Sequence, residues 1–158
     1  MQLFIMRHGD AIMSAPSDAQ RPLSEQGKVE ANLMGKWLHG LDVDIEQVLV
    51  SPYLRAQQTS TCLLSQLDCQ PNVKTLDMIT PSGSATEVHD YLDGLCSTNQ
   101  YQNLLIVTHM PLVSYLVAEL TYDYQAPIFQ TAAIAEINYD TKSMKGQLVR
   151  LISPLDLC

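Results

Sequence analysis

The chain has 158 residues, of which 46% are hydrophobic and 16% are charged, and its formal net charge is −8. These values fit one folded domain over residues 1–158 and exclude a disordered chain. The negative charge disfavours nonspecific nucleic-acid binding, which needs a basic surface. No apolar run is long enough for a membrane span, and Arg7 and Asp10 interrupt any N-terminal signal-peptide core. We therefore expect a cytoplasmic protein.

Four cysteines occur at positions 62, 69, 96 and 158, without a CxxC pair. Their spacing signals neither a zinc site nor a disulfide framework, so we expect reduced thiols. The chain has only nine Lys and Arg residues in total. An anionic substrate would need a local basic pocket in so acidic a chain, which makes each arginine close to a motif informative.

Apolar runs of strand length alternate with segments of helical period along the chain. This alternation predicts an α/β fold, a three-layer sandwich with a mostly parallel central sheet flanked by helices. The run NLLIVTH at 103–109 is apolar enough to be a central strand. We predict strands at 2–6, 47–50, 73–79, 103–109, 128–139 and 147–152, the last two as antiparallel neighbours.

Helix start signals stand between the predicted strands. Ser51 is a candidate N-cap with Pro52 at the first helical position, and Ser84 with Glu87 has the spacing of a capping box. Pro111 starts the helix that follows the central strand. We predict helices at 24–40, 51–67, 84–95 and 111–120.

Polar residues of an unusual kind stand where strands lead into helices. Arg7 and His8 follow the first strand, Arg55 lies in the first turn after the second, and His109 follows the central strand. Ligands of open α/β sheets bind outside the carboxyl ends of the strands, so these side chains are expected to converge there. The alternative is four separate surface residues. It is disfavoured because two of the chain's four histidines share this one edge.

Such a cluster suits phosphoryl transfer. Guanidinium groups match phosphate oxygens with paired donors, and helix N-termini at Ser51 and Pro111 add backbone donors, so charge can be held without a metal. A neutral imidazole with one free nitrogen can attack phosphorus when a hydrogen bond fixes its other nitrogen. Gly9, directly after His8, is expected to let the backbone turn sharply and approach the phosphate.

Three motifs at these junctions resemble the histidine phosphatase superfamily, whose fold is phosphoglycerate mutase-like. They are RHG after the first strand, SPYLRAQQT after the second and VTHMP after the central one. The longer segments MQLFIMRHGDA, RPLSEQG and HMPLVSYLVAEL are similar to the SixA-type phosphohistidine phosphatases, small members of that superfamily. The resemblance extends over nearly the whole chain.

The resemblance implies a role for each site residue. His8 would accept the phosphoryl group as a transient phosphohistidine, and Arg7, Arg55 and His109 would bind that group. His109 would donate to a phosphate oxygen, usefully in its charged form. Arg21, the arginine of the RPL element, would reach the same pocket; the alternative is a loop arginine that pairs with a nearby aspartate, Asp18.

The remaining two histidines are interpreted as ordinary helix residues. His39 is expected at a helix C-terminus facing solvent beside Gly40, where the helix dipole favours it. His89 is expected on an exposed helix face.

One position departs from the family pattern. Many relatives place an acidic residue after the third strand to protonate the leaving oxygen, and the aligned position here is Met78. Asp77 and Glu87 are nearby candidates, although Asp77 is expected to point to the opposite face of the strand. An alkoxide leaving group needs such an acid, whereas the imidazole of a phosphohistidine takes a proton from solvent. The departure therefore favours a phosphoramidate substrate.

Chain length gives a separate indication. Relatives that act on small molecules carry insertions that cover the pocket, and no sizeable lid insertion fits between the predicted second and third helices. We therefore expect an open site that accepts a phosphohistidine on a folded protein. The resemblance implies as partners a phosphotransfer domain of a sensor kinase or a phosphocarrier protein, with no metal, no cofactor and no membrane, and a monomeric state.

Two alternatives remain beside a protein phosphohistidine phosphatase. One is a small-molecule phosphomonoesterase of the same superfamily. The other is a non-catalytic phosphohistidine-binding module, which is disfavoured because a pure binder needs no nucleophile. A mutase would need a cap over the site that reorients the substrate.

Overall fold

The computed structural model describes residues 1–157 and is built on a six-stranded mixed sheet with the order β3-β2-β4-β1-β5-β6. The first four strands of this order pair in parallel, and β5 pairs antiparallel with both β1 and β6. The strands are β1 (Gln2–Arg7), β2 (Gln47–Val50), β3 (Asn72–Thr75), β4 (Asn103–Thr108), β5 (Ile134–Asp140) and β6 (Lys145–Ile152).

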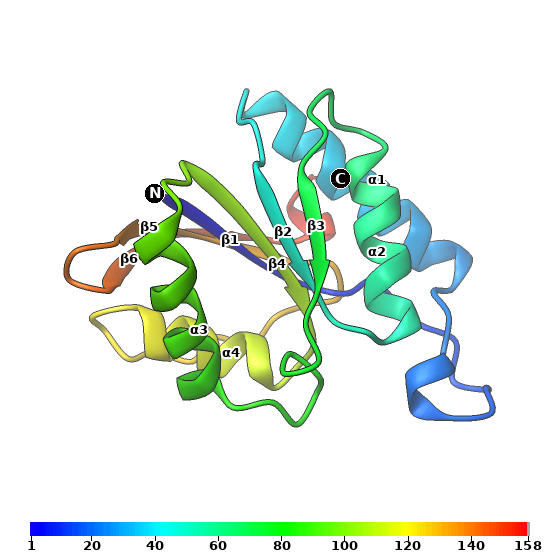
Figure 1. Ribbon diagram of the computed structural model, residues 1–158. Coiled ribbons are helices and arrows are strands. Elements are labelled where there is room, and N and C mark those ends of the chain that lie inside the picture. The colour runs from blue at the N-terminus through cyan, green and yellow to red at the C-terminus, as the bar shows by residue number, and fades with distance from the viewer. Residues whose placement is uncertain (158) are drawn as a thin grey trace.

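Helices cover both faces of the sheet (Figure 1). The pair α1 and α2 packs on one face, and the pair α3 and α4 packs on the other. The helices are α1 (Glu25–Gly40), α2 (Leu54–Leu64), α3 (Ala85–Thr98) and α4 (Leu112–Leu120). Short 3-10 turns occur at Asp18–Gln20 and Pro154–Leu157. The predicted three-layer α/β fold with a mostly parallel sheet is confirmed.

The first strand shows why both faces need a covering layer. Leu3 and Ile5 pack in the core with α3 and α4, whereas Phe4 and Met6 pack in the core with α1 and α2. All four side chains are fully buried. Successive residues of a strand point to opposite faces, so a continuous apolar run requires apolar contacts on both.

The second helix begins later than predicted. Its N-cap is Tyr53, and the side chain of Ser51 is engaged elsewhere, in a hydrogen bond to His109. Residues 52 and 53 form a bend before the first helical turn, and the helix ends at Leu64 instead of Leu67. Ser51 is therefore not the N-cap of α2. Its hydroxyl contacts His109 at the edge of the sheet and accepts from the N–H of Tyr53.

Two predicted strands are shorter in the structure. The segment at 73–79 forms a strand only over Asn72–Thr75, an exposed edge strand. The segment at 128–139 forms a strand only from Ile134 onward, because the backbone before it crosses the end of β1. There Ala132 donates to the carbonyl of His8, and Arg7 donates to the carbonyl of Ala133.

Two findings concern cysteines and membranes. Cys62, Cys69 and Cys96 are free thiols, as expected, and Cys158 lies outside the described residues. Within residues 1–157, no helix has both the length and the hydropathy to cross a membrane.

Candidate active site

His8 lies immediately after β1, with its backbone held from two sides. Its N–H donates to the carbonyl of Thr108 at 3.0 Å, and its own carbonyl accepts from Ala132 at 2.9 Å. The ring nitrogen Nδ1 lies 2.7 Å from the carbonyl oxygen of Gly9. Because a carbonyl can only accept, Nδ1 carries the ring proton and Nε2 keeps its lone pair.

Arg55 directs its guanidinium at that lone pair from the first turn of α2. Its Nε donates to His8 Nε2 at 3.2 Å, and the residue is only 4% exposed. Its terminal nitrogens bind Asp18, Nη1 at 2.6 Å from the main-chain carbonyl and Nη2 at 3.2 Å from the carboxylate. The guanidinium is therefore held between the His8 ring and the segment that precedes α1.

His109 follows β4, and its ring lies beside that of His8 with the centroids 5.0 Å apart. Its Nε2 lies 2.7 Å from Ser51 Oγ, a hydroxyl that already accepts from the N–H of Tyr53 at 3.2 Å. The hydroxyl hydrogen can then point at Nε2, which places the proton of a neutral His109 on Nδ1. Nδ1 is buried and has no hydrogen-bond partner among residues 1–157.

Arg7 is the last residue of β1 and supplies a second unpaired donor. Its Nη1 donates to the carbonyl of Phe129 at 2.9 Å, while its Nε is buried and finds no partner in the described part of the chain. Buried donors without partners are costly, and in native proteins they call for an explanation. The Nε of Arg7 and the Nδ1 of His109 are therefore two buried N–H groups that a bound anion would satisfy.

Both histidines are neutral in this site. Burial lowers the pKa of His8 to about 4; the hydrogen bond to Gly9 acts in the opposite direction, and nearby arginines add to the lowering. Burial also lowers the pKa of His109 to about 3, with further lowering from His8 and Arg55. Burial therefore favours the neutral form of His109 in this state of the site. A charged His109 beside a bound phosphate stays a prediction.

Comparison with known proteins agrees with this geometry. Residues 3–78 match the Histidine phosphatase superfamily (branch 1). The chain is 44% identical to the phosphohistidine phosphatase SixA of Escherichia coli (strain K12) over 158 residues, which covers 99% of this chain and 96% of that one. The chain belongs to the histidine phosphatase superfamily.

Two further similarities extend to the whole superfamily domain. A SixA homologue of Haemophilus influenzae is 39% identical over 148 residues, 89% of each chain. A solved structure of the protein histidine phosphatase SixA complexed with tungstate superposes with a TM-score of 0.95 at 43% identity and covers 100% of both chains.

Arg21 reaches the centre of this superfamily site only through another residue. Its Nη1 donates to Asp18 at 3.1 Å, its Nε donates to the carbonyl of Ile12 at 3.0 Å, and Asp18 in turn binds Arg55. The structure therefore shows the alternative interpretation, a pair with Asp18. That same pair links Arg21 to the guanidinium that faces His8.

The two glycines beside the site have a packing role. A Cβ on Gly9 would lie 2.7 Å from the carbonyl oxygen of Gly27, and a Cβ on Gly27 would collide with the carbonyl of Asp10. Neither glycine has a positive φ. Gly9 therefore does not use the left-handed region, and its close approach to phosphate stays a prediction. The residue is small because α1 lies against it, and its N–H donates to Thr59 Oγ1 at 3.0 Å.

The position aligned with the superfamily's acid holds no carboxylate. Met78 is partly buried and packs on the core formed with α3 and α4. The side chains of Asp77 and Glu87 are exposed.

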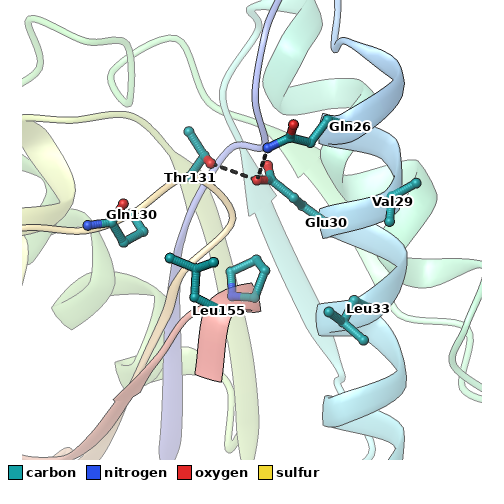
Figure 2. Close-up of a pocket in the computed structure, with 8 residues that line it drawn as sticks. Gln26, Val29, Glu30, Leu33, Gln130, Thr131 and Leu155 are labelled. Carbon is teal, nitrogen blue, oxygen red and sulfur yellow. Dashed lines mark hydrogen bonds between the residues drawn. The ribbon is translucent and has the colours of Figure 1, made fainter. Parts of the chain in front are cut away.

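A pocket of about 320 Å³ lies next to this site, between α1, residues 130–131 and the C-terminal 3-10 turn (Figure 2). At its rim Glu30 accepts hydrogen bonds from Thr131, at 3.0 Å, and from the N–H of Asp10, at 2.9 Å. None of the pocket's lining residues belongs to the histidine and arginine cluster. Glu30 therefore holds the backbone at Asp10, two residues after His8.

Sequence reasoning missed two site residues. Ser51 was assigned to a helix cap, although it directly follows β2 just as His109 follows β4, and that shared position at the sheet edge was a usable signal. Asp18 was considered only as a partner of Arg21. Its contact with Arg55 joins positions 37 residues apart, and no local pattern indicates it.

Proposed function

We propose that this protein is a protein phosphohistidine phosphatase that acts through a covalent phosphohistidine on His8. One observation carries the proposal: the lone pair of His8 Nε2 is held toward the Arg55 guanidinium, because Nδ1 donates to Gly9. A nucleophile fixed in its reactive tautomer beside an anion-binding fork is what phosphoryl transfer to histidine requires.

The reaction proceeds in two displacements. His8 Nε2 attacks phosphorus, the P–N bond to the substrate imidazole breaks, and the released imidazole nitrogen takes a proton from water. Water then attacks the phosphorus of phospho-His8, and inorganic phosphate leaves with His8 neutral again. During both steps Arg7, Arg55 and the Nδ1–H of His109 hold the phosphoryl oxygens, where charge develops.

The missing carboxylate supports a phosphoramidate substrate. An alkoxide leaving group depends on a positioned general acid, which contributes about 10²- to 10⁴-fold in rate. The aligned position holds the partly buried Met78. An imidazole leaving group has a ring nitrogen that is basic in water and needs no such acid.

The substrates we propose are histidine-phosphorylated proteins, either a phosphotransfer domain of a sensor kinase or a phosphocarrier protein. The relatives that are similar to this chain over 89% or more of its length include a phosphohistidine phosphatase and a homologue of it. We further propose a cytoplasmic monomer of a single domain, which would meet these partners in solution.

The test uses purified candidate proteins labelled with phosphate on histidine. Wild-type protein is expected to remove the label, and His8→Ala is expected to release none while its circular dichroism spectrum is retained. Arg55→Ala should lower kcat/KM by about 100-fold, because one oriented donor contributes on the order of 3 kcal/mol.

His39→Ala is the control, because His39 is an exposed histidine at the far end of α1. Full activity of His8→Ala would remove the assigned nucleophile. Equal turnover of an aryl phosphate and of a phosphohistidine protein would instead support the phosphomonoesterase alternative, and binding without release would support the binding module.

A further inference from the structure

Asp18 is the residue that connects Arg21 with Arg55. It begins the 3-10 turn Asp18–Gln20, and its side chain is 55% exposed. Its Oδ1 lies 3.1 Å from Arg21 Nη1, and its Oδ2 lies 3.2 Å from Arg55 Nη2. Its main-chain carbonyl accepts a third bond, from Arg55 Nη1 at 2.6 Å. One residue thus holds a buried guanidinium with both its backbone and its side chain.

The orientation of the Arg55 guanidinium follows from its two hydrogen bonds to Asp18. A guanidinium has five N–H groups in one plane, so binding the two terminal nitrogens to Asp18 fixes the direction of the plane. The Nε–H then faces His8 Nε2. Without the Asp18 contacts, the described restraints on the group would be the Nε–H bond to His8 and the Tyr53 ring, whose centroid lies 5.1 Å from the guanidinium carbon.

The charge of Asp18 also balances the site. Partial desolvation raises the pKa of Asp18, but hydrogen bonds from Arg21 and Arg55 outweigh it, so the net pKa lies below the ordinary value. Asp18 is therefore an anion at neutral pH, placed between two cations. This anion reduces the mutual repulsion of arginines gathered around one phosphoryl site.

We propose that Asp18 is a positioning residue, which holds the Arg55 guanidinium with its Nε–H directed at His8 and links Arg21 to the phosphoryl site. The proposal rests on the proposed function, because the orientation of Arg55 toward His8 matters only if His8 receives a phosphoryl group. The competing idea is that the Asp18 carboxylate imitates the substrate anion and must leave before phosphate binds. The hydrogen bond from Arg55 Nη1 to the Asp18 carbonyl argues against this competing idea, since rotation of the Asp18 side chain would not break that bond.

The test compares Asp18→Ala and Asp18→Asn with wild type, using tungstate affinity by calorimetry and the kinetics of phosphohistidine release. Asp18→Ala is expected to weaken tungstate binding and to lower kcat, each by roughly tenfold, because the charge-assisted hydrogen bond from Arg55 Nη2 to the carboxylate is lost. The change in KM should be smaller than the change in kcat. Asp18→Asn keeps one side-chain oxygen acceptor, so its tungstate affinity and kcat are expected to lie between those of wild type and those of Asp18→Ala.

Asp68→Ala is the matched control. Asp68 is a 94% exposed aspartate that pairs with His39, away from the site, and its removal changes the net charge by the same amount. Its tungstate affinity and kcat should equal those of wild type. Asp18 is itself exposed in a short turn, so its variants are expected to fold, and thermal unfolding curves check this.

A double-mutant cycle with Arg55→Ala distinguishes positioning from a general structural effect. If Asp18 acts through Arg55, adding Asp18→Ala to Arg55→Ala costs little further affinity or rate. An equal loss in both backgrounds overturns the proposal, as do unchanged values. Tighter tungstate binding by Asp18→Ala overturns it in favour of the competing-anion idea.

The readouts separate this proposal from the proposed function. Failure of the wild type to release phosphate from any phosphohistidine protein would contradict the function. The tungstate series needs no turnover, so it decides the role of Asp18 in anion binding in either case.

Discussion

At the scale of single residues, the two site histidines are set up as opposites. His8 donates through Nδ1 to a carbonyl and keeps Nε2 free, whereas His109 accepts at Nε2 from Ser51 and keeps Nδ1–H free. A neutral ring with a free Nε2 can act as a nucleophile, and a neutral ring with a free Nδ1–H can act as a hydrogen-bond donor. A single hydrogen-bond partner on each ring decides which role it can take.

The lowered pKa values of these histidines predict acid sensitivity. Their pKa values of about 4 and about 3 lie below the ordinary 6.5, so the unfolded chain takes up protons first as the pH falls. Stability from this source is complete above about pH 6.5 and is lost as the pH falls toward 4. Between about pH 7.5 and pH 5, we expect the free energy of unfolding to fall by about 2 kcal/mol for each histidine.

Urea denaturation at a series of pH values measures this effect. His109→Gln should remove roughly half of the fall, because one of the two lowered groups is gone. His39→Gln alters an exposed histidine and should keep the wild-type slope. A stability profile that is flat over this range, or identical in His109→Gln, would contradict the prediction.

At the scale of elements, His89 joins three of them, and its expected exposure was wrong. Its side chain, on α3, is only 12% exposed. Nδ1 lies 3.1 Å from Glu119 on α4, and Nε2 lies 2.8 Å from the carbonyl of Met144 and 3.1 Å from the hydroxyl of Tyr139. The tyrosine in turn donates to Asp93 at 3.0 Å. This joint attaches the β5–β6 hairpin to the α3–α4 layer.

We expect His89→Ala to lower the free energy of unfolding by about 2–3 kcal/mol, because partly buried hydrogen-bonding groups on α4 and on the β5–β6 hairpin lose their partner. Chemical denaturation measures the change, with His39→Ala as the exposed control near zero. Phosphate release by the folded variant should stay at the wild-type rate, since the joint lies outside the site. A change below about 0.5 kcal/mol would show that the contacts contribute little.

At the scale of the molecule, strand order brings the site together. The strands β2, β4 and β1 are consecutive neighbours in the sheet and run parallel, so their carboxyl ends meet at one edge. Arg55 follows β2, His109 follows β4, and His8 follows β1. Three junctions that are about fifty residues apart in the chain therefore converge.

This assembled site predicts activity that does not depend on a metal. Its donors are guanidinium and imidazole groups, and within residues 1–157 no three His, Cys, Asp or Glu side chains are grouped so as to hold a metal ion. EDTA is expected to leave the rate of phosphate release unchanged, and added Mg²⁺ or Zn²⁺ should not raise it. Activity lost to EDTA and restored by a divalent ion would show that charge is held by something other than these side chains.

Local physical chemistry made much of this protein predictable from sequence. The strands β1 and β4, which contain uninterrupted apolar runs, match their predicted ranges within a residue. An uninterrupted apolar run is stable only when it is buried on both faces of the sheet. Ser24 and Ser84 accept from Gly27 and Glu87 as helix N-caps, interactions between residues three positions apart. The convergence of His8, Arg55 and His109 also followed from a general rule about parallel sheets.

Only the tertiary structure decided the features that depend on partners far apart in the chain. These are the bond of Ser51 to His109, the grip of Asp18 on Arg55, the contact of Gly9 with α1 and the burial of His89. In each case the residue could satisfy a local role, such as a helix cap, a loop ion pair, a turn or a solvent-facing helix position. Which role it takes depends on the surface that packs against it, and that surface exists only after the sheet has formed.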